Sequence, residues 1–434
     1  MKINKKLFMI PEVFTKTLTE AIKDSPNIIN LARGDSEFAT PQMVTRYLSK
    51  IILDDGDYKS DINIPIGRWT HYEKESGSIH LRNSIIRKYH LESGLDISVN
   101  NVLVTHGGMN AIFYAFSAVL VPEDEIIVFD PAYIAYEPIC GYILHNVKVR
   151  RMPLLQEENY DINYVRLSNM ISDRTKAIIF TSPYNPCGRV YTYEQISELM
   201  SFCHRNNIFL IHDENHEKEV YDGNIHYPVS IFNKDFSHSI LLNSFSRLGM
   251  GGWRVGWMVA NEQIIAASQR LHAFVNMTCN TFVQEAAAFA LDHYSKLGFD
   301  EKFLNYKMKR DKLIAFFEKI PGIECLVPEG TCYIFPRITD FYNENRKIML
   351  NKIMNSSWFS SLSKDKKEYE EKMIGKWKSY LIYLYFLLEL KVGIIPGCCY
   401  GNNSDNNIRI SFSVRDEAIS EGLSRMNKLT VEGV

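Results

Sequence analysis

The sequence predicts an α/β protein, with a mostly parallel sheet in a large domain and a second, smaller α/β domain. The first observation is an alternation of short apolar runs with longer helical stretches from about residue 100, a pattern typical of parallel strands covered by helices. The second is the length of 434 residues, which exceeds the usual size of one hydrophobic core. We therefore expect two packed units.

The predicted strands of the large domain are short, and each is followed by a polar or glycine-rich turn. They span 102–105, 125–129, 177–181, 208–212 and 239–244, with a helix at 110–120 after the first strand. In sheets of this kind, ligands bind beyond the carboxyl ends of the strands. The turns after these strands are therefore the expected location of a functional site.

The composition changes after about residue 300, where a Lys-rich amphipathic helix at 299–319 precedes Pro-Gly turns at 321 and 396. This change predicts the smaller α/β domain. We expect an N-terminal segment at 1–50 that packs with the small domain, a large domain at 51–300 and a small domain at 301–434. The stretch 342–378 is rich in Lys, Ser, Asn and Glu, and predicts a solvated helical insertion rather than core.

The balance of charge favours a small-molecule partner. Lys and Arg number 49 against 51 Asp and Glu, which gives a formal net charge of -2. Such a chain has no global field to attract nucleic acid or an anionic membrane. No basic helix-turn-helix extension is evident, which argues against a DNA-binding regulator.

The cysteines and apolar runs predict a cytoplasmic protein. The eight cysteines are scattered and include no Cys-x-x-Cys pair, so we expect reduced thiols and no metal site. The apolar run before Pro11 is only four residues long, too short for a signal peptide. The longest apolar run, 380–388, is too short to span a bilayer.

The run from Leu241 to Trp257 reads Leu-Leu-Asn-Ser-Phe-Ser-Arg-Leu-Gly-Met-Gly-Gly-Trp-Arg-Val-Gly-Trp. It resembles the cofactor-anchoring loop of the class I/II aminotransferases, the fold type I enzymes that use pyridoxal phosphate. In that family Ser-x-Ser-Lys carries the lysine that holds the cofactor as a Schiff base, whereas Arg247 stands here. A guanidinium is always protonated and cannot form this link. The resemblance therefore implies pyridoxal or pyridoxamine phosphate held noncovalently.

The resemblance covers nearly the whole chain, in ordered motifs from Asn30 to Phe412. It implies that Asp213 pairs with the pyridine nitrogen of the cofactor, that Asn185 donates to the phenolic oxygen and that Tyr133 stacks on the ring. The alternatives are structural: a helix-capping aspartate, a turn asparagine before proline and a tyrosine packed in the core.

Other motifs match the family's phosphate site, where backbone N–H groups at a helix start act together with hydroxyls and a cation. Tyr72 matches a tyrosine that usually reaches the phosphate of the partner subunit, which implies a homodimer. Arg247 and Arg254 are seven residues apart, one fewer than is usual, so the loop is shortened. The matching residues are Gly107, Gly108, Met109, Ser244, Ser246 and Arg254.

Arg409, in Ile-Arg-Ile-Ser-Phe, matches the arginine that binds the α-carboxylate of the substrate, a bidentate task suited to a guanidinium. Gly34 and Asn185 match further positions of the substrate pocket. The resemblance thus implies an amino acid or keto acid as the substrate.

His216 stands three residues after Asp213, where the family normally has a tyrosine. Histidine titrates near neutral pH and can act as a base, but the change is equally explained by loss of a dispensable tyrosine. One hypothesis is an enzyme with a noncovalent cofactor, in which His216 is the base and Arg247 stabilises carboxylate or phosphate charge. The other is a catalytically silent binding protein. An engineered lysine-to-arginine change is a third reading, opposed by His216 and the shortened loop.

Overall fold

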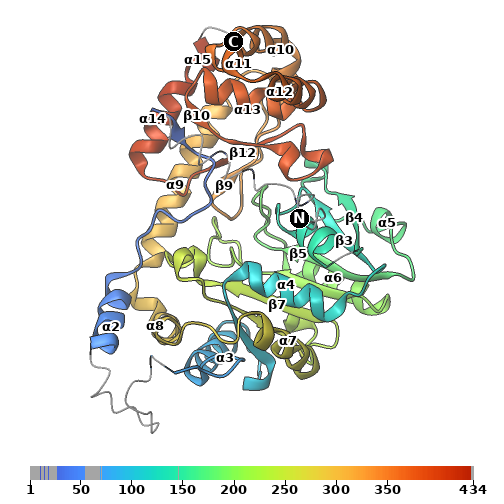
Figure 1. Cartoon of the computed structure of the whole chain (residues 1–434), viewed down its shortest axis with the longest axis vertical. Coiled ribbons are helices and arrows are strands. Elements are labelled where there is room, and N and C mark those ends of the chain that lie inside the picture. The colour runs from blue at the N-terminus through green and yellow to red at the C-terminus, as the bar shows by residue number, and fades with distance from the viewer. Residues whose placement is uncertain are drawn as a thin grey trace, which may run out of the picture.

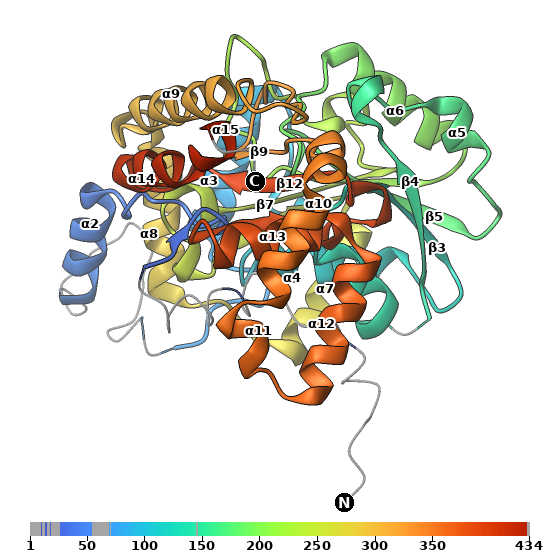
Figure 2. The ribbon, with the colours of Figure 1, turned by 90° about the horizontal axis from the view of Figure 1, so that it is seen from above.

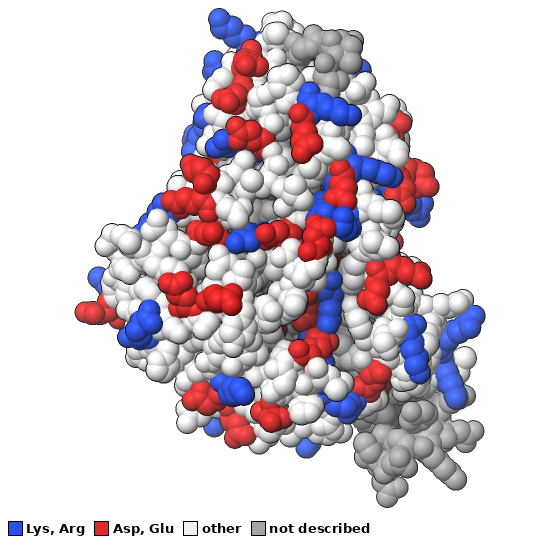
Figure 3. Space-filling model, turned by 180° about the vertical axis from the view of Figure 1, so that it is seen from behind, with Lys and Arg blue, Asp and Glu red and all other residues white. Residues whose placement is uncertain are grey.

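The computed structural model describes residues 27–53, 71–144 and 146–431, together with Ile10, Phe14, Leu18 and Trp69. Figure 1 shows two lobes, one built around a large sheet and the other carrying the C-terminal helices. Acidic and basic side chains are intermingled over the face shown in Figure 3, as expected from the nearly balanced charge.

A seven-stranded sheet forms the centre of the large lobe. Its strands lie in the order β2-β8-β7-β6-β5-β3-β4, and β8 is antiparallel to both neighbours while the other pairs are parallel. This confirms the predicted α/β fold, although β4 and β8 were missing from the prediction. The strands are β2 (Val102–Thr105), β3 (Glu125–Asp130), β4 (Lys148–Pro153), β5 (Thr175–Thr181), β6 (Phe209–Asp213), β7 (Ser239–Ser244) and β8 (Gly256–Val259).

Helices cover both faces of this sheet, so most of its strand residues are buried. Because side chains alternate along a strand, Ile127 and Phe129 of β3 join one hydrophobic cluster while Ile126 and Val128 join the other. The helices of this lobe are α3 (Ile79–Ser93), α4 (Gly108–Val119), α5 (Tyr164–Ser168), α6 (Tyr193–Arg205), α7 (Glu262–Val275) and α8 (Thr281–Asp292).

The small lobe contains an antiparallel sheet in the order β11-β12-β9, and a short parallel pair of β1 with β10. The β1 pairing connects residues near the N-terminus to the C-terminal lobe. Helix α2 (Gln42–Leu53) instead packs on α8, with Tyr47 stacked on Phe289 at 4.1 Å between ring centroids. The strands are β1 (Ile29–Asn30), β9 (Tyr333–Ile334), β10 (Val392–Gly393), β11 (Ile395–Pro396) and β12 (Ile408–Ser411).

Seen from above, α9 and α14 lie side by side, and α10, α12 and α13 form a second group (Figure 2). No helix among the described residues is long and apolar enough to cross a membrane. The helices of this lobe are α9 (Phe299–Phe317), α10 (Thr339–Met354), α11 (Ser357–Ser361), α12 (Lys364–Lys376), α13 (Lys378–Leu388), α14 (Asp416–Met426) and α15 (Lys428–Val431).

The predicted insertion at 342–378 is helical, but only part of it is surface decoration. Helix α12 buries a single residue, Ile374, whereas α10 buries Tyr342, Met349 and Ile353 and packs on α13. The prediction was therefore wrong for α10. Its apolar residues recur at helical spacing and form one buried stripe, although Lys, Asn and Glu dominate the local composition.

Candidate active site

A cavity of about 1080 Å³ lies where three parallel strands of the large lobe end. Thr181, Asp213 and Ser244 are the last residues of β5, β6 and β7, and all three line it. Tyr333 of β9 and Arg409 of β12 also line it, so the cavity lies between the lobes. The predicted site residues that it brings together are Gly34, Gly108, Met109, Tyr133, Asn185, Asp213, His216, Ser244, Ser246, Arg247, Arg254 and Arg409.

Asp213 is held firmly at the floor of the cavity. Its side chain is buried, and its Oδ2 accepts a hydrogen bond from the Tyr136 hydroxyl at 2.8 Å. Its Oδ1 accepts from the Asn215 side-chain amide at 2.6 Å and from the Asn215 backbone at 3.2 Å. A carboxylate has about four lone-pair sites, so Asp213 can accept a further hydrogen bond from a ligand.

Small residues and hydroxyls form one end of the cavity at the start of α4. Gly107 has a φ of 79°, and a Cβ there would lie 2.6 Å from Nη2 of Arg254. Arg254 donates to the carbonyls of Gly251 at 3.0 Å and His106 at 3.1 Å. Ser244 and Ser246 hydrogen-bond to each other, with 3.0 Å between their Oγ atoms. The helix start, hydroxyls and exposed cation suit a phosphate group.

Arg247 projects from the loop after β7 toward the small lobe. One terminal nitrogen, Nη1, donates to the carbonyl of Gly34, and the other, Nη2, donates to the Tyr333 hydroxyl at 3.0 Å. Cys332 Sγ lies 3.8 Å from Nη1. The guanidinium is therefore engaged by main chain and side chains of other segments. No lysine lines the cavity among the residues that the structure describes.

His216 is buried beside Arg247 and is oriented by a carboxylate. Its Nδ1 contacts Oε2 of Glu219 at 2.5 Å, and its Nε2 makes no hydrogen bond to the described residues. Burial lowers the pKa of the His216 imidazole, and the charge of Arg247 lowers it further, against the opposing effect of Glu219. His216 is therefore neutral near pH 7 and can accept a proton.

Arg409 is buried between two tyrosine rings. Its guanidinium carbon lies 4.0 Å from the ring centroid of Tyr333 and 5.2 Å from that of Tyr400. Nη2 donates to the Ala32 carbonyl at 2.9 Å and Nη1 to Oδ1 of Asn185 at 3.4 Å. Its Nε has no hydrogen-bond partner within the described part of the chain. This arrangement presents a fixed cation to an anion in the cavity.

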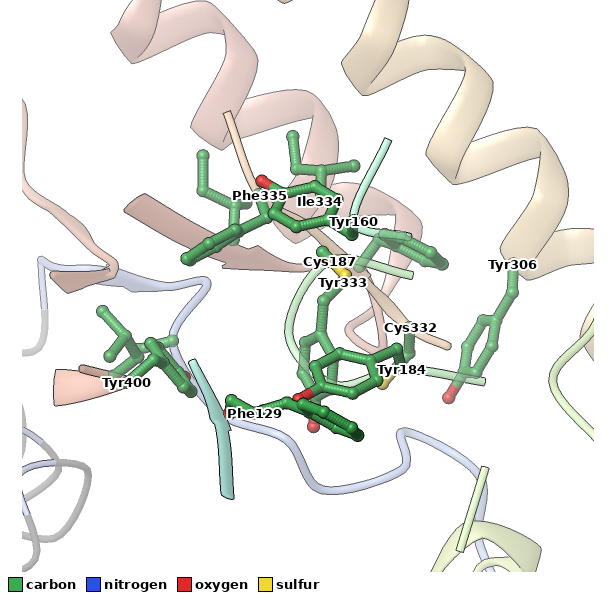
Figure 4. Packing of buried hydrophobic residues seen from close by; sticks show 14 of the residues in the cluster. Phe129, Tyr160, Tyr184, Cys187, Tyr306, Cys332, Tyr333, Ile334, Phe335 and Tyr400 are labelled. Atoms are coloured by element: carbon green, nitrogen blue, oxygen red, sulfur yellow. Dashed lines mark hydrogen bonds between the residues drawn. The ribbon is translucent and has the colours of Figure 1, made fainter. Parts of the chain in front are cut away.

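The aromatic residues around this site continue the core from one lobe to the other. Tyr333 and Tyr400 of the small lobe belong to the same hydrophobic cluster as Phe129 and Tyr184 of the large lobe (Figure 4). Tyr184 also donates to the Pro131 carbonyl at 2.7 Å. The contact between the lobes beside the cavity therefore consists of buried, packed aromatic rings.

Two predicted site residues do not line the cavity. Gly107 lies next to it and contacts Arg254 as described above. Tyr72 is 81% exposed, so its place in a site of a partner subunit stays a prediction. Tyr133 does line the cavity and donates to Sδ of Met109 at 3.6 Å.

Sequence reasoning missed several residues that hold the site together. Tyr136 and Asn215 fix Asp213, Glu219 orients His216, and Tyr333 contacts both arginines. Asn215 and Glu219 carried a signal because they lie next to the Asp213 motif. Tyr333 carried none, because its strand is remote in the sequence.

The residues of the cavity fit pyridoxal phosphate in their chemistry. The buried Asp213 carboxylate suits a protonated pyridine nitrogen, and the glycine start of α4 leaves room for a phosphate that a Cβ would restrict. Arg409 lines the cavity as a fixed cation, which suits a carboxylate. The set therefore contains a place for the ring, the phosphate and an amino-acid carboxylate.

Comparison with known proteins identifies relatives over the whole chain. The aspartate aminotransferase of Pyrococcus horikoshii is 28% identical over 428 residues, which cover 98% of this chain and 96% of that protein. Aromatic-amino-acid aminotransferase 2 of Thermococcus litoralis is 27% identical over 436 residues, covering 100% and 99% of the two chains. The crystal structure of an aromatic aminotransferase from Pyrococcus horikoshii superposes with a TM-score of 0.77 at 26% identity, covering 95% of this chain and 98% of that one.

The family model of aminotransferase class I and II matches residues 26–426, which is nearly the whole chain. The match includes the strands, the loop after β7 and the strand that carries Arg409. Together with the parallel sheet and the cavity at the strand ends, it shows that this chain belongs to the class I and II aminotransferase family of pyridoxal-phosphate-dependent proteins.

Proposed function

We propose that this protein is an enzyme that holds pyridoxal or pyridoxamine phosphate noncovalently and acts on an amino acid or a related carboxylate. The observation that carries the proposal is the placement of Arg247. It occupies the loop where family members have the anchoring lysine, and both of its terminal nitrogens are engaged by Gly34 and Tyr333. The absence of lysine from the described cavity lining supports the same proposal.

Binding of the cofactor rests on noncovalent contacts in this proposal. The carboxylate of Asp213 pairs with the pyridine nitrogen, and Ser244, Ser246 and Arg254 bind the phosphate with the start of α4. A charge-assisted hydrogen bond in a buried site contributes about 1.5 to 3 kcal/mol. When bound, the cofactor supplies an electron sink for carbanion chemistry at the substrate. The protein supplies binding, orientation and a base.

Arg409 and Asn185 bind the substrate carboxylate. The two side chains already contact each other at 3.4 Å, so one carboxylate can reach both. The rings of Tyr333 and Tyr400 hold the Arg409 guanidinium in place, which limits the freedom lost on binding. Gly34 lines the same part of the cavity, where Tyr333 OH would lie 2.3 Å from an added Cβ.

His216 is the proposed base. A base is useful when its neutral form is populated at the working pH and another group fixes its orientation. The lowered pKa of His216 meets the first condition, and the contact of Nδ1 with Glu219 meets the second. Nε2 then removes a proton from the substrate or returns it. Arg247 assists by keeping His216 neutral through its charge.

The proposed assembly is a homodimer in the cytoplasm, as implied by the family resemblance. Tyr72 is 81% exposed on one chain and would reach the phosphate site of its partner. Chemical crosslinking followed by sedimentation analysis tests the dimer directly. A purely monomeric protein at micromolar concentration would contradict it.

The proposed function is tested with purified protein, pyridoxal phosphate and single amino acids. Absorbance reports cofactor binding, and mass spectrometry reports products and any covalent adduct after borohydride reduction. We expect cofactor binding, conversion of at least one amino acid or keto acid, and no lysine adduct. His216→Asn should abolish conversion while cofactor binding persists, and His238→Asn, at a half-buried position outside the cavity lining, should change neither.

The variant Arg247→Lys separates the enzyme from a silent binding protein. If the unaltered protein binds the cofactor but converts nothing, and Arg247→Lys alone gains transamination with a covalent adduct at position 247, the protein is catalytically silent. Conversion by the unaltered protein supports the enzyme. A borohydride-trapped lysine in the unaltered protein would contradict the noncovalent site.

A further inference from the structure

Three residues with metal-binding side chains converge beside the active-site cavity. His106 follows β2, His272 lies on α7 and Cys279 lies in the turn before α8. One donor atom from each lies within 4.8 Å of the donor atoms of the other two. No sequence motif predicts this cluster, because His106 is far from the other two residues along the chain.

His272 is the unusual member of the cluster. It is 0% exposed, and neither Nδ1 nor Nε2 makes a well-formed hydrogen bond to the residues that the structure describes, although the backbone of Glu75 lies near the ring. Its ring packs edge-on against His106, with 6.1 Å between centroids, and lies 5.3 Å from the ring of Tyr114. Buried polar atoms nearly always have a partner, so a buried imidazole without a well-formed hydrogen bond is a candidate ligand for a metal. The ring is enclosed within one chain, so a second subunit cannot supply that partner.

His106 is oriented as metal-binding histidines usually are. Its Nε2 contacts the backbone carbonyl of Thr278 at 3.1 Å, so Nε2 carries the proton and Nδ1 carries the free lone pair. A histidine that binds a metal through one nitrogen typically donates its other N–H to a carbonyl or carboxylate. Cys279 is 1% exposed and is a free thiol next to Thr278.

Two other clusters of metal-binding side chains lack these features. In the cluster of His212, Glu214 and His226, one nitrogen of each ring is engaged: His226 Nε2 contacts Glu214, which also accepts from Tyr89, and His212 Nδ1 accepts from a backbone N–H. Only the other ring nitrogens, His212 Nε2 and His226 Nδ1, lack a partner among the described residues, whereas both nitrogens of His272 do. The cluster of His216, Glu219 and Cys332 lies against the guanidinium of Arg247, 3.8 Å from the sulfur, which repels a cation.

We propose that His106, His272 and Cys279 bind one Zn²⁺ ion. Zinc prefers donor sets such as two imidazoles and one thiolate. Zinc sites are also known in which three protein ligands leave a fourth position for water or a carboxylate. Zinc bond lengths imply that the donor atoms of bound ligands lie roughly 3.3 to 3.8 Å apart. The donor atoms of these three residues lie within 4.8 Å of one another, so side-chain movements of about 1 Å bring them to zinc-binding distances.

Glu75 is the candidate for the fourth ligand. Its Oε2 accepts from Nε2 of Gln269 at 3.3 Å, and Gln269 lies one turn before His272 on α7. Arg254 donates to the backbone carbonyl of His106 and not to its ring. Bound zinc would join the start of α4, helix α7 and the turn before α8. It would thereby fix the His106 carbonyl that positions Arg254.

The proposal is tested on the full chain after removal of metal with a chelator, and it does not depend on the proposed reaction. Zinc binding is measured by calorimetry, and Co²⁺ is used as the spectroscopic probe. We expect one equivalent of zinc, a rise in the melting temperature on zinc addition, and a thiolate-to-cobalt charge-transfer band. Cys279→Ser should remove the band and weaken zinc binding by more than about a hundredfold. Loss of a residue that only hydrogen-bonds to a metal ligand weakens binding by at most about a hundredfold, so a larger loss identifies Cys279 as a ligand.

Two further variants keep the test decisive. Cys203→Ser changes a buried cysteine of α6 and should leave the band and the affinity unchanged. His106→Gln, at a half-buried position, should weaken zinc binding if Cys279→Ser fails to fold. Absence of the cobalt band in the unaltered protein, or equal zinc affinity in the unaltered protein and in folded Cys279→Ser or His106→Gln, overturns the proposal.

Discussion

Arg247 donates a hydrogen bond to the hydroxyl of Tyr333 at 3.0 Å, and this contact joins the loop after β7 to the first residue of β9. The ring of Tyr333 also packs 4.0 Å from the guanidinium carbon of Arg409. One tyrosine therefore contacts both Arg247 of the loop after β7 and the arginine that is proposed to bind the substrate. A substitution of either arginine should therefore alter the position of the other, because both contact this ring.

Removal of the Tyr333 hydroxyl should lower the free energy of unfolding. Tyr333→Phe keeps the ring that packs on Arg409 but leaves the half-buried Arg247 without the acceptor of its Nη2. Loss of a hydrogen bond to a charged group costs about 1.5 to 3 kcal/mol. Denaturant unfolding followed by circular dichroism measures the change.

A double-mutant cycle isolates this contact from other effects of the substitution. In an Arg247→Met background, Tyr333→Phe should cost at least about 1 kcal/mol less than in the unaltered protein, because the donor is already gone. Additive losses in the two backgrounds would show that the hydrogen bond does not couple the residues.

Replacement of Asp213 by asparagine should weaken binding of pyridoxal phosphate. An amide cannot hold a proton on the pyridine nitrogen through a charge-assisted contact worth about 1.5 to 3 kcal/mol, so the dissociation constant should rise by about ten- to 150-fold. Fluorescence titration with pyridoxal phosphate measures it. Asp173→Asn, at an exposed turn, serves as the control, and an unchanged affinity in Asp213→Asn would remove Asp213 from the cofactor site.

Most of the parallel sheet could be predicted because its strands carry continuous apolar runs that end at polar turns. Val102–Thr105 and Ser239–Ser244 were placed with the bounds that the structure has. The strand Gly256–Val259 was missed because it is short and directly follows the cofactor loop, whose motif masks its apolar residues. Its antiparallel direction depends on contacts with β2 and β7, which no local pattern encodes.

The site could be predicted where a side chain belongs to a motif after a strand, as with Asp213 and Ser244. It could not be predicted where function depends on distant segments. The direction of Arg247 follows from Gly34 and Tyr333, which lie 213 and 86 residues away along the chain. The His106–Cys279 cluster likewise forms only when two distant segments meet.

Truncation of Lys88 should strongly destabilise the protein. Its buried ammonium lies 2.7 Å from a carboxylate oxygen of Glu217 and 3.0 Å from one of Glu92. Lys88→Met leaves the buried Glu217 carboxylate without this partner, and breaking a buried pair in this way costs about 3 to 5 kcal/mol. Chemical denaturation should show the loss as a lower midpoint.

The double variant Lys88→Met/Glu217→Leu tests the cause of that loss. Replacement of a buried ion pair by apolar residues is often neutral, so the double variant should recover most of the stability. Glu92 keeps Lys218 as a partner at 2.7 Å in either variant. If the double variant is no more stable than Lys88→Met, lost packing of the lysine stem is the cause, and the uncompensated charge is not.

His80 should make the stability of the protein depend on pH above neutrality. This residue of α3 contacts Asp292 at 3.3 Å and Glu285 at 2.8 Å on α8. Asp292 and then Glu285 raise the pKa of the imidazole from 6.5 to about 9. Because the folded protein holds this proton more tightly, the contribution to stability is complete below pH 6.5 and is lost as the pH rises through 9.

The melting temperature of the unaltered protein should therefore fall between pH 6.5 and 9 relative to that of His80→Gln, which lacks the titrating group. The side chain of His80 is 36% exposed, so solvent screening reduces the size of the effect but not its direction. His90→Gln, near the C-terminal end of the same helix and 62% exposed, is the matched control and should follow the unaltered protein. The two carboxylates stabilise the charged imidazole and not the neutral one, so the difference between the unaltered protein and His80→Gln should change with pH. A difference that stays constant from pH 6 to 10 would show that the α3–α8 contact does not depend on a protonated imidazole.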